Sequence, residues 1–180
     1  MNTRNTATTT GTAGTASPAL STVSMTTPIG RLDIVAHDDA IVAIWFEVDG
    51  DGRRLDDAIP VERGEHPVLD LAVEQLEEYF AGSRSEFDLP LDPRGTAFQQ
   101  QAWHALRRIP YGETISYGEQ ARMLGDKNKS RAVGAANGRN PIPIVVPCHR
   151  VVGSNGHLTG FAGGLDTKAW LLDHERANVL

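Results

Sequence analysis

Three prolines within seven residues constrain one segment of this chain more than any other feature. They are Pro141, Pro143 and Pro147. Each proline fixes its own φ, lacks an N–H and restricts the residue before it, so the segment predicts an extended, non-helical path. The apolar residues 144–146 direct this path toward the interior. It ends at Cys148, which His149 and Arg150 follow directly.

Cys148 is the only cysteine of the chain. A single cysteine excludes an internal disulfide and a Cys-rich zinc site. Such a residue is most often a small buried hydrophobe. Two features favour a reactive thiol instead: the cationic neighbours favour the thiolate form, and the proline bracing is typical of a preorganised site.

His149 is a candidate base for this thiol. Adjacent side chains of an extended segment point to opposite sides, which argues against direct contact and against a protease-like Cys-His dyad. We expect His149 to reach the thiol through a water molecule and to need a carboxylate that orients it. Glu175 is the candidate carboxylate. It follows Leu171 and Leu172 by four and three residues, so it lies either in solvent at the edge of an apolar stripe or buried with a partner.

The first half of the chain predicts a small α/β unit. Residues 1–23 contain eight threonines and few large apolar side chains, which is typical of a disordered tail. Alternating residues in 32–36 and 41–45 predict a β-hairpin, and apolar residues at helical spacing predict a helix from Pro67 to Phe80. Residues 86–93, with two prolines, are interpreted as a linker.

The second half predicts helices. Two capping boxes open two of them: Thr96 with Gln99, and Ser116 with Glu119. A turn over 125–128 then leads to a further helix over 129–137. Two short helices joined by a turn that contains glycine predict a helix-turn-helix, a pattern that many non-binding proteins share.

The charge is divided unevenly between the halves. Residues 1–93 hold 6 Lys/Arg and 17 Asp/Glu, whereas residues 94–180 hold 11 and 6, which gives −11 and +5. A basic half is a candidate surface for a polyanion, although unselected drift in composition would give the same totals. No apolar run is long enough to span a bilayer, and the N-terminus has no signal core. We therefore expect a cytoplasmic protein with no membrane partner.

The segment Pro147-Cys-His-Arg-Val151, with Asn140 upstream, resembles the O6-alkylguanine-DNA alkyltransferase family. Other segments follow the family's order and spacing, and the resemblance covers roughly residues 25–178. Those segments are Ile109–Tyr117, Ser130–Ala136, Gly160–Leu165 and Lys168–Glu175.

The resemblance implies an α+β fold. It implies a small ribonuclease H-like α/β domain with its linker over 24–93, then a mostly helical, winged helix-turn-helix-like domain over 94–180. The implied activity is that of a methylated-DNA–protein-cysteine methyltransferase. Such a protein transfers the alkyl group of O6-alkylguanine in DNA irreversibly to Cys148, once per molecule. O4-alkylthymine is a second candidate substrate.

The resemblance also implies roles for residues around the thiol. Cys148 accepts the alkyl group, and His149, through water, links it to Glu175. Tyr117 donates a hydrogen bond to guanine N3, and Asn140 braces the turn before the active-site segment. Further residues line the substrate pocket. They are Val151, Pro143, Asn137, Phe161, Ala162 and Gly163. The family commonly has Tyr at the position of Phe161 and, in some members, a hydroxyl residue at that of Ala162, so this pocket is less polar.

The implied partner is double-stranded DNA that contains O6-alkylguanine, bound through its minor groove by a protein that is monomeric when free. Arg131 takes the place of the flipped nucleotide. The other implied DNA contacts are Ser130, Ala132, Ala135, Lys129, Arg139 and Tyr117. We expect no cofactor and no metal, because the cysteine ligands of the family's zinc-containing members are absent.

Three other classes of protein are weighed against this one. A non-catalytic lesion-binding relative would lack the acceptor thiol. A DNA-binding regulator would not need the Pro-Cys-His-Arg segment or Glu175. A thiol hydrolase would release product catalytically. Labelled O6-methylguanine DNA separates them, because only the alkyltransferase gives stoichiometric label on the protein.

Overall fold

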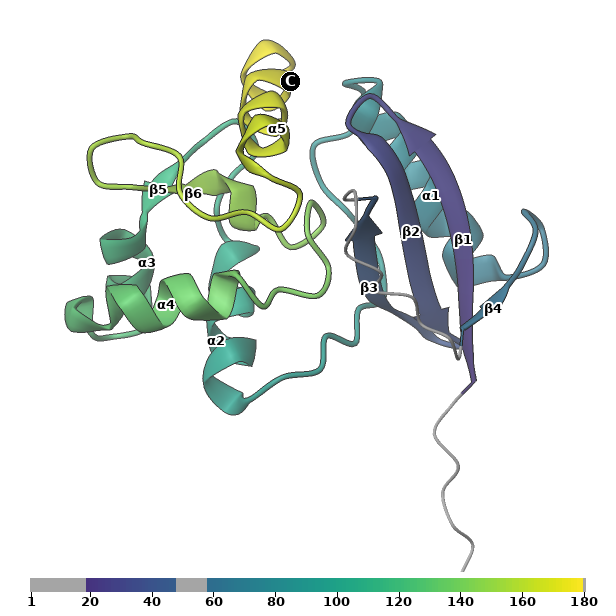
Figure 1. The fold of residues 1–180 in the computed structure, drawn as a ribbon, viewed down its shortest axis with the longest axis horizontal. Coiled ribbons are helices and arrows are strands. Elements are labelled where there is room, and N and C mark those ends of the chain that lie inside the picture. Colours follow the sequence, from purple (N-terminus) through teal and green to yellow (C-terminus); the bar gives the residue numbers. More distant parts are fainter. Residues whose placement is uncertain (1–18, 48–57, 180) are drawn as a thin grey trace, which may run out of the picture.

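The computed structural model describes residues 19–47 and 58–179. Figure 1 shows two lobes side by side: a twisted sheet with one helix against it, and a group of short helices. A last helix lies beside the region where the lobes meet. None of the helices in the described residues has the length and apolar character that crossing a bilayer requires.

The N-terminal lobe is a four-stranded sheet. Its strands are β1 (Leu20–Thr27), β2 (Gly30–His37), β3 (Ala40–Phe46) and β4 (Ala58–Pro60). Their spatial order is β3-β2-β1-β4. The two pairs β1–β2 and β2–β3 are antiparallel, whereas β4 runs parallel to β1. The predicted hairpin is therefore confirmed as β2–β3.

The expected disordered tail over residues 1–23 is wrong at its C-terminal end. β1 begins at Leu20, and Ser21 to Thr27 pair with β2. Threonine is β-branched and suits a strand, so composition alone did not separate a tail from this strand. Val23 also packs against the core. The rest of the expected tail, residues 1–18, lies outside the described residues.

Helix α1 (Pro67–Phe80) covers one face of the sheet. Pro67 occupies its first turn, and His66 caps it by accepting the Leu69 N–H. The helix predicted from Pro67 to Phe80 is therefore confirmed. The helix buries Leu69 and Leu76 against strand residues such as Ile34.

The expected linker contributes to the sheet. The Ile41 N–H donates to the Pro90 carbonyl at 2.9 Å, and the Asp92 N–H donates to the Ile41 carbonyl at 2.8 Å. Farther along the same edge, the Ile44 N–H donates to the Pro141 carbonyl at 2.9 Å. The edge of β3 is therefore paired with both the linker and the start of the proline-rich segment.

The C-terminal lobe has the predicted helix-turn-helix arrangement. Its helices are α2 (Ala97–Leu106), α3 (Tyr117–Met123) and α4 (Ser130–Asn137), with a 3₁₀ turn η1 (Lys127–Lys129) before α4. Both capping boxes form as expected. Helix α4 begins at Ser130, one residue later than expected. The side chain of Asp126 accepts the Asn128 N–H and caps the 3₁₀ turn η1, which precedes the helix.

The proline-rich segment is not helical, but the expected extended path is wrong. The Val145 N–H donates to the Pro143 carbonyl and the Cys148 N–H donates to the Val146 carbonyl, which makes two γ-turns. The first places Ile144 at φ 73°, a strained value for a β-branched residue. The chain then enters the 3₁₀ helix η2 (Cys148–Arg150). Proline fixes φ but leaves ψ open, so it permitted these turns.

Two further elements complete the fold. A short parallel pair joins β5 (Ile115–Ser116) to β6 (Val151–Val152), and helix α5 (Leu165–Ala177) closes the chain. One continuous apolar cluster extends from the sheet through Trp103 and Val146 to Leu171. The two lobes therefore share a core. The predicted α+β class is confirmed.

Two buried amides hold the helix-turn-helix together. Gln120 of α3 and Asn137 of α4 exchange two hydrogen bonds, at 3.0 and 2.7 Å, and Gln120 also donates to the Ala102 carbonyl of α2 at 3.1 Å. Buried amides without partners are costly, so this pair fixes the angle at which α4 is presented.

We expect Gln120→Leu to lower the free energy of unfolding by about 1–3 kcal/mol, because it leaves the Asn137 amide buried and unpaired. Urea denaturation monitored by fluorescence measures this loss. Gln101→Leu on the exposed side of α2 is the matched control, and we expect it to stay within about 0.5 kcal/mol. Equal midpoints for the two variants would contradict the assigned role of the pair.

Candidate active site

A cavity of about 290 Å³ lies beside Cys148 in the C-terminal lobe. It brings together six expected site residues besides the cysteine. They are Tyr117, Asn137, Asn140, Pro143, Phe161 and Ala162. Three glycines complete its lining, at positions 134, 138 and 160, and none of them was expected to line the pocket. The residues come from α3, α4, the proline-rich segment and the loop before α5.

Two expected pocket residues do not line this cavity. The side chain of Val151 is buried in the core, and its carbonyl accepts a hydrogen bond from Lys168 Nζ at 2.7 Å. Gly163 faces the other lobe instead, where a Cβ would lie 3.0 Å from the Phe46 ring. Val151 can therefore contribute to the site only through its backbone, and Gly163 only through the loop to which it belongs.

Cys148 opens the 3₁₀ helix η2 and is buried. Burial raises the pKa of its thiol above the ordinary value, while a hydrogen bond from Asn140 and the charge of Lys168 act in the opposite direction. The resting thiol is therefore protonated at neutral pH. The expectation that the cationic neighbours His149 and Arg150 favour thiolate is therefore wrong for the resting protein: the charge that lowers the thiol pKa is that of Lys168, and burial has the larger effect.

Glu175 is fully buried, so the alternative of a solvent-exposed position at the edge of its helix is wrong. Its carboxylate accepts hydrogen bonds from four residues. They are Tyr79 Oη at 2.8 Å, His149 Nε2 at 2.7 Å, Arg150 Nε and Nη2 at 2.8 and 3.0 Å, and the Gly112 N–H at 3.1 Å. Burial alone would raise the pKa of this carboxyl, but the hydrogen bonds from His149 and Arg150, together with the charge of Arg150, hold it well below its usual range. Glu175 is an anion throughout the neutral range.

This carboxylate determines the tautomer of His149. An ionised carboxylate only accepts hydrogen bonds, so Nε2 carries the proton in the 2.7 Å contact. Burial lowers the pKa of the imidazole and outweighs the opposite effect of Glu175, so the ring is neutral. Nδ1 is therefore an unprotonated acceptor, and it is buried without a hydrogen-bond partner in the described part of the chain. A lone pair in this position can receive a proton.

Asn140 holds the proline-rich segment in its turns. Its Nδ2 donates to the Val146 carbonyl at 2.7 Å, and its Oδ1 accepts the Ile142 N–H at 3.0 Å. These bonds close the segment on itself and offset the strained φ of Ile144. Asn140 therefore fixes both the backbone before Cys148 and the polar contact with its thiol.

Sequence reasoning missed three residues that this site uses. Tyr79 and Arg150 bind Glu175, and Lys168 donates to the carbonyls of Val151 and Thr159 at 2.7 and 2.9 Å. Lys168 is fully buried, and burial lowers its pKa. The signal for Arg150 was its place in the Pro-Cys-His-Arg segment, whereas nothing in the local sequence distinguished Tyr79.

Tyr117 lies at the entrance to α3 with its hydroxyl already engaged. It donates to the Thr159 carbonyl at 3.0 Å and accepts from Thr159 Oγ1 at 3.2 Å. The ring lies against Gly134 of α4, where a Cβ would be 3.7 Å away. The hydroxyl would have to release the Thr159 carbonyl in order to donate to a ligand.

Helix α4 exposes the residues that were expected to contact DNA. Arg131, Ala132 and Ala135 are exposed, and Arg139 is exposed just beyond the helix. Lys129 is also exposed, with its ammonium 5.8 Å from the centre of the Phe98 ring. Ser130 is half-buried and donates to the Lys127 carbonyl at 3.0 Å. α4 buries the opposite face, which carries Val133 and Ala136.

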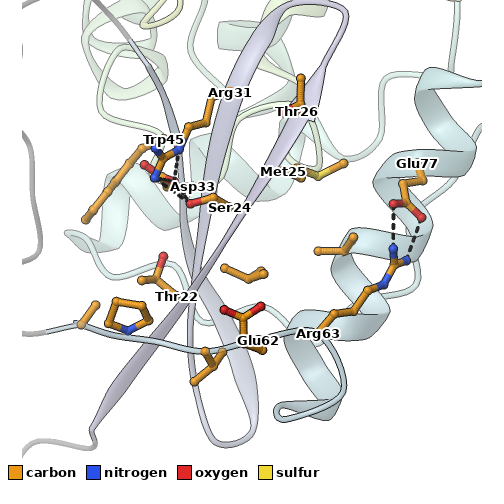
Figure 2. Close-up of a pocket in the computed structure, with 15 residues that line it drawn as sticks. Thr22, Ser24, Met25, Thr26, Arg31, Asp33, Trp45, Glu62, Arg63 and Glu77 are labelled. Atoms are coloured by element: carbon orange, nitrogen blue, oxygen red, sulfur yellow. Dashed lines mark hydrogen bonds and ion pairs between the residues drawn. The ribbon is translucent and has the colours of Figure 1, made fainter.

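A larger cavity, of about 730 Å³, lies on the N-terminal lobe. Figure 2 shows that four of its charged residues form two pairs, Arg31 with Asp33 and Arg63 with Glu77, whereas no ion pair joins Glu62 to the other residues drawn. Among the described residues, no thiol or imidazole lines this larger cavity. The reactive candidate, the Cys148 thiol, lines the smaller one. In the described ranges, no three His, Cys, Asp or Glu side chains gather as metal ligands would.

Two family models match nearly the whole described chain. The ribonuclease-like domain of 6-O-methylguanine DNA methyltransferase matches residues 22–93, and the DNA binding domain of the same family matches residues 97–177. A methylated-DNA–protein-cysteine methyltransferase of Mycolicibacterium paratuberculosis is 48% identical over 85% of this chain and 90% of its own length. The chain belongs to the 6-O-methylguanine DNA methyltransferase family.

Other methyltransferases of the family agree with this assignment. The constitutive methylated-DNA–protein-cysteine methyltransferase of Bacillus subtilis is 47% identical over 83% of this chain and 92% of its own length. A crystal structure of the Mycobacterium tuberculosis OGT in complex with DNA superposes with a TM-score of 0.78 at 43% identity, covering 88% of this chain and 93% of the other.

We expect Glu175→Gln to lower the free energy of unfolding at pH 7 by about 3–5 kcal/mol, because it leaves Arg150 buried without its counter-ion. The folded-state pKa of Glu175 is depressed, so its contribution is complete above the usual glutamate pKa and is lost as pH falls below it. The gap between the variant and the parent should narrow by roughly 1.4 kcal/mol for each pH unit below about 4.3.

Urea denaturation of both proteins between pH 3 and pH 7 measures this gap. Tyr79→Phe is the companion variant: it removes one hydrogen bond to the charged carboxylate and should cost about 1.5–3 kcal/mol. A gap that does not change with pH would mean that the pKa of Glu175 is the same in the folded and unfolded protein. A gap that widens as pH falls would mean that Glu175 is protonated in the folded protein. Either result contradicts its assigned state.

Proposed function

We propose that this protein repairs DNA by transferring the alkyl group of O6-alkylguanine to Cys148, once per molecule. One observation carries the proposal: the chain's single thiol lines a cavity and is followed directly by a neutral histidine that a buried glutamate holds in one tautomer. Membership of the methyltransferase family supports the substrate class.

The chemistry follows from the states of these groups. The Cys148 thiol gives its proton to His149 Nδ1, through a bound water, and Glu175 stabilises the imidazolium that forms. The thiolate then attacks the saturated alkyl carbon, forming a C–S bond as the C–O6 bond breaks. The electron pair leaves on O6, and guanine is restored when it takes up a proton. The thioether resists hydrolysis, so each molecule acts once.

The walls of the cavity would orient the base. Tyr117 would exchange its bond to the Thr159 carbonyl for one to guanine N3. The carbonyls of Cys148 and Val151 would accept the guanine 2-amino group through their second lone pairs, since the Val151 N–H and Lys168 already use the first. Lys168 and Asn140 act as positioning residues for this wall.

DNA would bind along α4 through the minor groove. The alkylated base cannot be attacked inside the stack, so it must be flipped out at a cost of a few kcal/mol. Arg131 would fill the space that the base leaves, and Ala132 and Ala135 would allow the helix to approach the groove closely. Lys129, Ser130 and Arg139 would contact phosphates, and the free protein would be a monomer.

We expect Cys148→Ala to abolish alkyl transfer while DNA affinity changes less than about threefold, because the thiol acts in the chemistry and one buried methyl-sized change leaves α4 in place. Incubation with DNA labelled on the O6-methyl group, followed by mass spectrometry of the protein, measures transfer. Stoichiometric label on the variant would exclude Cys148 as the acceptor. If the parent protein instead releases the label into solution over many turnovers, it is a hydrolase.

We expect Arg131→Ala to reduce the repair rate on duplex DNA by about tenfold or more, and on single-stranded DNA by much less. Opening a stack costs a few kcal/mol, and only the duplex has a stack to open. Single-turnover kinetics on both substrates measure the ratio. Arg176→Ala, at an exposed site on α5, removes the same charge and is the matched control. Equal losses of repair rate on both substrates would mean that Arg131 only contacts phosphate and does not fill the space left by the base.

A further inference from the structure

The far end of β3 in the N-terminal lobe reaches the wall of the active-site cavity. Phe46 is the last residue of β3, and its ring centre lies 5.4 Å from that of Phe161 at an interplanar angle of 60°. Phe161 lines the cavity. The same Phe46 ring lies so close to Gly163 that a Cβ there would be 3.0 Å from it. Two residues of the loop before α5 therefore rest on one side chain of the other lobe.

The loop has few other supports at this point. Its polar anchor is Thr159, whose carbonyl accepts bonds from Tyr117 and Lys168. Beyond Thr159, the Gly164 N–H donates to the Phe161 carbonyl at 3.0 Å, which closes a turn within the loop but does not tie it to the rest of the protein. The Phe161 side chain has no hydroxyl, so only packing can hold its ring.

We infer that Phe46 is a positioning residue that sets the width of the alkyl pocket from the N-terminal lobe and so limits the size of the alkyl group that Cys148 accepts. The inference rests on the proposed alkyl transfer. Phe46 itself does not line the cavity. It acts through Phe161, whose ring forms the cavity wall, and Gly163 is the residue that lets it approach.

The consequence is a change in preference and not in basic reactivity. A methyl group needs little room beyond the guanine itself, whereas a benzyl group must displace the Phe161 wall. Removing the Phe46 ring frees Phe161 to move outward. The rate for the large group should rise relative to the small one by about two- to tenfold, the range that one aromatic pair spans.

The test measures single-turnover rate constants on duplexes that contain O6-methylguanine or O6-benzylguanine. Phe46→Ala should raise the benzyl-to-methyl rate ratio about two- to tenfold. Phe46→Tyr keeps the ring and should leave the ratio unchanged, as should Leu71→Ala, an exposed apolar truncation on α1. In a Phe161→Ala background, Phe46→Ala should have no further effect, because the residue through which it acts is gone.

Several outcomes overturn the inference. One is a benzyl-to-methyl rate ratio that Phe46→Ala leaves unchanged. Another is a rise in this ratio on adding Phe46→Ala to Phe161→Ala that equals the rise in the parent protein. If Phe46→Ala fails to fold, Phe46→Leu keeps most of the apolar volume without the ring and must still raise the ratio. Iodoacetamide alkylation of Cys148 should be unchanged in the folded single variants of Phe46, since Phe46 does not line the cavity beside the thiol. If the unmodified protein transfers neither group, the proposed function fails, whereas transfer with an insensitive ratio removes only the role of Phe46.

Discussion

The carboxylate of Glu175 is the group on which the rest of this structure depends. It binds Tyr79 of the N-terminal lobe, the turn at Gly112, and both His149 and Arg150 beside the thiol. A buried arginine is tolerable only with a counter-ion, and the neutral histidine presents Nδ1 only because Nε2 is committed to the carboxylate. The same charge therefore joins the two lobes and sets the protonation state that the chemistry needs.

Local signals in the sequence predicted most of the elements. The pairs Thr96–Gln99 and Ser116–Glu119 specified two helix starts, since each side chain satisfies a backbone group within four residues. The proline-rich segment was predicted poorly, because its turns depend on burial and on two hydrogen bonds of the Asn140 side chain, which donates one and accepts the other. β1 was missed for a similar reason: a strand that mixes serine and threonine with apolar residues is stabilised by its neighbour β2, which lies later in the chain.

The site was predicted where its chemistry resides in short motifs and missed where it depends on tertiary contacts. Cys148 and His149 belong to one segment, helical spacing offered Glu175 as the carboxylate, and the family resemblance added Asn140 and Tyr117. Tyr79 lies 96 residues from the carboxylate it binds, so no local pattern could assign it. Lys168 resembles any helical lysine in the sequence, and only the fold shows that it is buried against two carbonyls.

The pairing along β3 also determines what happens when the two lobes separate. The outer edge of that strand has its hydrogen-bonding groups occupied by Pro90, Asp92 and Pro141, which belong to the linker and to the active-site segment. Were the lobes to part, the strand would present open N–H and C=O groups next to newly exposed apolar residues, which is a template for intermolecular pairing. Partial opening would thus favour aggregation over a reversible intermediate, and protection from misassembly is a second reason for the lobes to stay together.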